Sequence, residues 1–163
     1  MSLTNYIKNR FSTQKYIIEV GVMSDRTKRK ETVKLGMTNA ELMFIHENGS
    51  PLRRIPARPV LEMTIIWANE SGLLKQTISK ITKMLITEND ENKIDNEIKK
   101  LCLKIQNYAR KIIYSNDGRL VANAPSTVKR KGDNHPLFDT GQLARSITCR
   151  YIKIKKENKH DWR

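Results

Sequence analysis

The sequence is poor in aromatic residues, in cysteine and in long apolar stretches, and each shortage narrows the possible functions. Aromatic residues make up 6% of the 163 residues, and none alternates with Lys and Arg as a base-stacking surface for single-stranded nucleic acid would require. The two cysteines, Cys102 and Cys149, lie in a helical and a strand-like pattern without a metal-ligand spacing, so we expect reduced, structural thiols in an intracellular protein. No apolar run approaches the ~20 residues that span a bilayer, and no signal peptide is evident. We therefore expect a soluble protein with no membrane contact.

Catalytic and cofactor-binding patterns are also missing. His46 and Glu47 begin like a His-Glu-x-x-His zinc motif, but Ser50 stands where the second His would have to be. His135 and His160 lie in loops without a fixed cluster of carboxylates or thiolates. No Ser is embedded in a nucleophile-elbow pattern, and no glycine-rich loop suits a phosphate. We therefore expect neither an enzyme nor a protein that holds a metal or another cofactor.

Positive charge, in contrast, is abundant. Lys and Arg number 31 against 17 Asp and Glu, which gives a formal net charge of +14. Basic residues concentrate in residues 26–34, in 99–131 and from 145 onward, whereas residues 88–97 form an acidic island. This balance favours a polyanionic partner, although a solvated surface explains any single cluster equally well.

The rest of the chain is organised around residues 38–62, which predict a helix, a sharp stop, an ordered loop and a second helix. Thr38 or Asn39 can cap the first helix, and apolar residues recur at helical spacing after it. Gly49 is expected to end this helix, because glycine readily adopts the left-handed conformation of a helix terminus. Pro51 cannot continue the helix, since it has no backbone N–H to donate.

Two prolines shape the loop that follows. Pro56 and Pro59 hold the two residues between them extended, and Pro59 suits the first turn of a new helix. The result is a rigid elbow, from whose fixed backbone three arginines project: Arg53, Arg54 and Arg58. Glu47, at the end of the first helix, is available to pair with one of them.

The remaining chain predicts an α+β fold, with a small antiparallel sheet packed against several helices. Strands are expected at residues 15–24, 32–35 and 146–155, and the first two would form a hairpin with an exposed basic turn. Apolar residues at helical spacing predict helices at 60–69, 74–85 and 94–112, and a short amphipathic helix near the N-terminus. The last two long helices would form an antiparallel pair. Packing onto the protein's own sheet is the more common fate of such stripes, with an outside coiled-coil partner as the alternative.

Residues 116–138 form a long polar connection with little that could build a core. Unstructured loops of this length are uncommon in compact domains unless they are functional or disordered, so we expect an extended arm that becomes ordered on a neighbouring subunit. Asp139 is expected to cap a short helix, with Gln142 as its capping-box partner, and this helix leads into the last strand. The chain is thus expected to form a single domain over residues 1–155, followed by a flexible tail at 156–163.

Two blocks of the sequence resemble a known family. In the first, a helix ending in His-Glu-x-Gly at residues 46–49 leads to Ile-Pro-Ala-Arg-Pro at 55–59. In the second, residues 137–147 read LFDTGQLARSI, an Asp-Thr-Gly-x-Leu helix start that runs into a final strand, and residues 124–132 resemble the linker before it. These blocks, in this order, resemble the neck and tail-completion proteins of tailed bacteriophages, the group that includes the minor tail protein Z type. The central helices carry no such resemblance.

The resemblance implies a structural virion protein that forms a ring, a hexamer if the usual symmetry of the tail applies. Made in the host cytoplasm, the ring would join the head connector to tail tube or tail terminator proteins at the head-proximal end of the tail. For such a protein we expect subunit contacts from one set of residues: Arg53, Arg54, Arg58, Asp139 and Gln142. A second set is expected to contact DNA in the neck channel or a neighbouring subunit: Arg26, Lys28, Arg29, Lys30, Lys129, Arg130 and Lys131. The alternative, to which the charge alone would lead, is a free protein that binds nucleic acid without sequence specificity.

Overall fold

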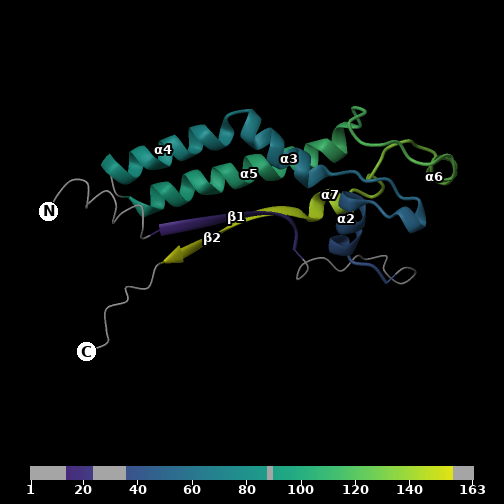
Figure 1. Ribbon diagram of the computed structural model, residues 1–163, viewed down its shortest axis with the longest axis horizontal. Coiled ribbons are helices and arrows are strands. Elements are labelled where there is room, and N and C mark those ends of the chain that lie inside the picture. The colour runs from purple at the N-terminus through teal and green to yellow at the C-terminus, as the bar shows by residue number, and fades with distance from the viewer. Residues whose placement is uncertain (1–13, 24–35, 88–89, 156–163) are drawn as a thin grey trace.

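The computed structural model describes residues 14–23, 36–87 and 90–155. Within these ranges the chain forms two strands, six α-helices and one 3₁₀ turn, arranged as an elongated molecule (Figure 1). In chain order they are β1 (Gln14–Val22), α2 (Asn39–Asn48), the 3₁₀ turn η2 (Pro51–Arg53), α3 (Val60–Glu70), α4 (Leu73–Thr87), α5 (Glu91–Ser115), α6 (Pro125–Lys131), α7 (Gln142–Ser146) and β2 (Ile147–Lys155).

The sheet joins strands from the two ends of the described chain. β1 and β2 pair antiparallel in one unbroken register, from Gln14 opposite Lys155 to Val22 opposite Ile147. The α+β class and these two strands are confirmed. The expected strand at 32–35 and the expected N-terminal helix both lie outside the described residues, as does the expected tail.

α5 is the longest helix and connects the other layers. It starts at an Asp90 cap, whose carboxylate accepts hydrogen bonds from the backbone N–H groups of Asn92 and Lys93 at 3.0 and 3.2 Å. Figure 1 shows α4 lying beside α5, and α5 running along the two strands. Because only a short connection separates α4 from α5, the two helices run antiparallel, as the sequence predicts. One buried stripe of α5 faces its neighbours: Ile94, Ile98, Leu101, Ile105, Ala109 and Ile112.

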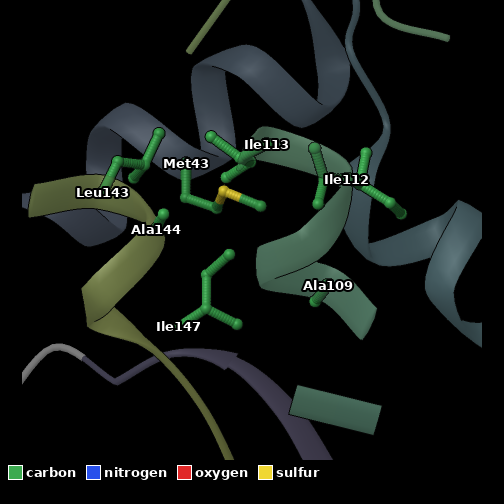
Figure 2. Close-up of a cluster of buried hydrophobic side chains, with 8 residues drawn as sticks. Met43, Ala109, Ile112, Ile113, Leu143, Ala144 and Ile147 are labelled. Atoms are coloured by element: carbon green, nitrogen blue, oxygen red, sulfur yellow. The ribbon is translucent and has the colours of Figure 1, made fainter. Parts of the chain in front are cut away.

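The core next to the elbow is built where α2, α5 and α7 meet. Figure 2 shows the Met43 side chain of α2 lying between Ile112 and Ile113 of α5 and Leu143 of α7. Ile147, the first residue of β2, closes this cluster and is fully buried. The side chain of Met43 therefore ties the helix before the elbow to the centre of the molecule.

The segment 116–138 differs from the extended arm that the sequence predicts. It contains the helix α6, and Leu120 packs against the core cluster that Met43 belongs to. His135 Nε2 lies 2.6 Å from the carbonyl oxygen of Ile113 in α5. The segment is thus held by its own chain, because a few apolar and polar anchors outweigh its polar average composition.

The expected capping box at Asp139 and Gln142 is wrong. α7 begins only at Gln142, its N-cap is Gly141 at φ 73°, and no side chain caps it. Asp139 is exposed two residues before that cap, so its carboxylate does not serve the first turn. The left-handed Gly141 turns the chain sharply and places the helix start two residues later than the capping-box pattern requires.

Within the described ranges, no helix combines the length and the apolar character needed to cross a lipid bilayer.

Candidate subunit interface

The elbow begins with a well-fixed helix. Thr38 Oγ1 accepts a hydrogen bond from the backbone N–H of Glu41 at 3.2 Å, and the Glu41 carboxylate accepts one from the backbone N–H of Thr38 at 2.7 Å. This capping box confirms Thr38 as the N-cap that starts α2. Both ends of α2 are therefore defined by its own sequence, since the helix stops where Gly49 follows it.

Gly49 is required at the stop. Its φ is 75°, and a Cβ atom at this position would lie 2.9 Å from the backbone nitrogen of Ala57 and 3.0 Å from the carbonyl oxygen of Ile55. Positive φ and close approach of a second backbone are the two conditions that favour glycine. The prediction that Gly49 ends the helix is confirmed, and the close contact packs α2 against the far side of the loop.

A closed turn follows Gly49. Ser50 and Ile55 exchange two backbone hydrogen bonds of 2.8 and 3.0 Å, and the N–H of Arg54 donates to the carbonyl of Pro51 at 3.0 Å. Arg54 itself adopts the left-handed conformation at φ 52°. We call residues 51–54, which stand beyond the Ser50–Ile55 pair, the elbow tip.

The elbow tip projects its side chains into solvent. Leu52 is 100% exposed, and Arg53 and Arg54 are exposed beside it. A leucine that buries none of its surface contributes nothing to the stability of its own chain through burial. The closed turn nevertheless fixes its position, which is the property of a contact point for another molecule.

Glu47 binds the far end of the elbow and does not pair with an elbow arginine as the sequence suggests. Its two carboxylate oxygens accept hydrogen bonds from the backbone N–H groups of Leu61 at 3.1 Å and Glu62 at 2.8 Å. These are orphan donors of the first turn of α3, whose N-cap Pro59 offers no side-chain hydrogen bond. The carboxylate also suits the positive end of the helix dipole. Glu47 is thus a cap supplied by α2 to α3, and Pro59 lies one residue before the helix rather than inside its first turn.

Arg58, which the sequence assigns to a subunit contact, is buried and used within its own chain. The residue is 5% exposed. Its Nε donates to the carbonyl oxygen of Val121 at 2.7 Å, and its Nη2 donates to that of Ala122 at 2.9 Å. Its backbone N–H also donates to the carbonyl of His46 at 2.6 Å. Arg58 therefore clamps segment 116–124 onto the elbow.

His46 lies beside Arg58, and the charge of Arg58 affects the pKa of its imidazole. Burial, together with the positive charge of Arg58, lowers the pKa of His46 from 6.5 to about 4. The imidazole is therefore neutral at pH 7. Within the described ranges, no group of three or more His, Cys, Asp or Glu side chains lies close enough to hold a metal ion.

The other expected contact residues are placed as follows. Lys129 and Arg130 are exposed in the last turn of α6. Lys131 instead donates to the carbonyl oxygens of His135 and Phe138, so its ammonium group is used within its own chain. Four further candidates lie outside the described residues: Arg26, Lys28, Arg29 and Lys30. Asp139 and Gln142 lie before and at the start of α7, away from the elbow tip in the sequence, and the structure gives them no shared contact with it.

The sequence alone did not single out Leu52 or the groove next to α2. An open groove of about 370 Å³ lies between the end of β1 and α2, lined in part by Val20, Val22, Phe44 and Leu61. Phe44 is 70% exposed. Leu52 carried a readable signal, because it is an apolar residue inside a turn between Pro51 and two arginines. The groove carried none, because it is formed by three separate segments of the chain that only the fold brings together.

Comparisons with protein-family models, with curated proteins and with solved structures gave no match to this chain.

Proposed function

We propose that this protein is a structural virion component of a tailed bacteriophage, a ring-forming neck or tail-completion protein that joins the tail to the head connector. Its role is structural rather than catalytic. The observation that carries the proposal is the elbow tip, where Leu52, Arg53 and Arg54 stand in solvent on a turn closed by backbone hydrogen bonds. The resemblance of residues 46–59 to the elbow block of neck proteins supports the same reading.

A rigid, exposed tip suits binding to another protein. Association costs free energy when loops and side chains must be ordered, so a contact that is already fixed in the free protein loses less on binding. Single exposed leucines are common on protein surfaces, but here the chain uses Gly49, the Ser50–Ile55 pair and the Glu47 cap to hold one in place. Arginine beside an apolar anchor is typical of residues that dominate protein interfaces.

The net charge fits a position around packaged DNA. A chain of +14 in a ring would line or flank a channel with positive charge, and Lys129 and Arg130 at the end of α6 are exposed enough to contact phosphates or a neighbouring subunit. Contacts to phosphates alone carry no sequence information. Any binding of free duplex DNA should therefore be independent of sequence. It should also weaken steeply as the salt concentration rises, because binding releases counterions from the DNA and this release is less favourable at high salt.

Complementation tests the proposal. In the phage whose genome encodes this chain, deletion of the gene should leave filled heads and separate tails, visible by negative-stain electron microscopy. The wild-type gene supplied in trans should restore joined particles. Leu52→Asp should fail to restore them, whereas Ile78→Asp, a matched change at a 62% exposed apolar position of α4, should succeed.

Two outcomes would decide against the proposal. If deletion of the gene still gives normal, joined particles, the protein does not act in the neck. Binding of free duplex DNA that stays tight at physiological salt, measured by gel shift with the purified chain, would favour the free nucleic-acid-binding protein instead.

A further inference from the structure

The groove between β1 and α2 is an apolar surface that the described part of the chain leaves open. Its apolar lining comes from Val20 and Val22 of β1, Phe44 of α2 and Leu61 of α3. At about 370 Å³ it is large enough for one or two side chains of a partner. Phe44 is 70% exposed, so an occupant of the groove could cover apolar surface of this side chain.

The groove is also locally acidic in a strongly basic chain. Two carboxylates line it, Glu19 and Glu47. Glu19 pairs with Arg150 at 2.7 Å, but both side chains are substantially exposed, and such surface pairs are weak and easily shared. Glu47 accepts two backbone N–H groups, which leaves its negative charge in place. An occupant that combines an apolar side chain with positive charge therefore fits the groove best.

The elbow tip has this combination. Leu52 is the apolar group, and Arg53 and Arg54 carry the charge, all three exposed on a closed turn. Figure 1 shows the segment between α2 and α3 reaching out at the end of the molecule where α6 lies, away from the paired strands. Each copy of the chain thus carries a tip and a complementary groove, which are made of different residues.

We propose that the elbow tip of one copy docks into the β1–α2 groove of the next copy, with Leu52 against Phe44 and the tip arginines beside Glu19 and Glu47. This inference rests on the proposed ring, and it names the two surfaces that the ring joins. The occupant is a second copy of this chain, because the charge of the groove matches the charge of the tip. Where each boundary uses one tip and one groove, the contact is heterologous, so it repeats from copy to copy and generates a closed ring or an open filament.

Mixed disulfide cross-linking tests this pairing. A tagged Leu52→Cys chain is mixed with an untagged Phe44→Cys chain over a concentration series under mild oxidation, and the linked product is resolved by mass. We expect a heterodimer joined through positions 52 and 44. Because each chain carries only one of the two new cysteines, a link can form only between copies.

Three controls make the result specific. Leu52→Cys mixed with wild type accounts for the native Cys102 and Cys149, and Leu52→Cys mixed with Ile78→Cys accounts for random collision at an exposed apolar site. Both mixtures should give no heterodimer. Charge reversal of the tip, Arg53→Glu with Arg54→Glu in the Leu52→Cys chain, should abolish the 52–44 link.

Several outcomes would overturn the pairing. A Leu52→Cys homodimer in place of the heterodimer would indicate a two-fold contact. Absence of the 52–44 link at every concentration would leave the groove to a different neck protein. Failure of this inference is distinguishable from failure of the proposed function, because a ring observed in virions without the 52–44 link contradicts only the pairing, whereas the link in solution with the chain missing from virions contradicts only the neck role.

Discussion

Arg58 of the elbow donates its Nε–H to the carbonyl oxygen of Val121 at 2.7 Å, across 63 positions of the chain. The same guanidinium donates to the next carbonyl, that of Ala122, at 2.9 Å. One buried side chain thus couples the elbow to the segment between α5 and α6. The rigidity of the elbow tip therefore depends on contacts made well behind it.

Replacing Arg58 by Ala should destabilise the folded chain. The change removes two hydrogen bonds from a charged donor to the carbonyls of Val121 and Ala122. Both residues are exposed, so water can replace part of the loss, and we expect a cost of about 1–3 kcal/mol in all. The melting temperature should fall, and limited proteolysis should cut first within residues 116–124. Arg53→Ala, which removes the same side chain from an exposed position, should leave the melting temperature almost unchanged. Equal melting temperatures for the two variants would refute the clamp.

Replacing Gly49 by Ala should cost more stability than the same change at Gly132. The two glycines share a positive φ, 75° and 74°, but Gly49 has ψ 178°, a region essentially restricted to glycine, whereas Gly132 has ψ 3° in the left-handed helical region. Only Gly49 faces a second backbone, with Ala57 N at 2.9 Å from the built Cβ, whereas nothing lies within 4 Å at Gly132. Chemical denaturation measures the difference. A loss for Gly132→Ala as large as that for Gly49→Ala would show that neither the backbone conformation of Gly49 nor the close approach sets it apart.

Glu47→Ala should remove the cap of α3. By analogy with the loss of N-cap side chains, the free energy of unfolding should fall by about 0.5–2 kcal/mol. Glu47→Gln keeps one carbonyl oxygen that can accept and should lose less, because only the charge facing the helix dipole and one acceptor are removed. Glu70→Ala, an exposed carboxylate in the last turn of the same helix, is the control and should have little effect. Identical denaturation midpoints for all three variants and wild type would contradict the capping role.

Stability should fall with acidification through His46. Its pKa is 6.5 in the unfolded reference and about 4 in the folded chain, so the unfolded state binds the proton first as the pH drops. Stability conferred by the neutral imidazole is therefore complete above about pH 6.5 and is lost progressively toward pH 4. Carboxylates with a lowered pKa, such as Glu97 beside Lys100 and Lys80, change their charge only at and below their ordinary range of pH.

Melting curves between pH 7 and pH 5 check this prediction. The wild-type melting temperature should decline over that interval, and His46→Gln, which cannot titrate, should show a clearly flatter profile. The same slope in both proteins would mean that His46 is not held neutral by burial beside Arg58.

Local sequence signals predicted the start and stop of α2, the α4–α5 pair and the two strands. Thr38 and Gly49 act through the backbone within a few residues, so their effects are readable from the chain itself. The apolar stripe of α5 was readable for the same reason, because helical periodicity reports which face is buried.

The direction of Arg58 was not readable, because its acceptors lie 63 and 64 positions away in a segment whose composition suggests no core. The role of Glu47 was mispredicted for a related reason. A carboxylate near arginines suggests an ion pair, but the Glu47 carboxylate instead accepts hydrogen bonds from the unsatisfied N–H groups of α3. The predicted capping box at Asp139 is wrong because the same sequence allows a left-handed Gly141 to serve as N-cap, so the helix starts later. In each of these cases the position of the side chain depends on hydrogen bonds to distant segments or on a backbone turn, which the local sequence does not reveal.

A cryo-electron microscopy reconstruction of the virion neck would show whether this chain forms the proposed ring. We expect a closed ring between the head connector and the tail, with residues 51–54 of each copy lying at the boundary to the next copy. Density in which the chain is absent from the neck, or is present as isolated copies that do not touch, would contradict it.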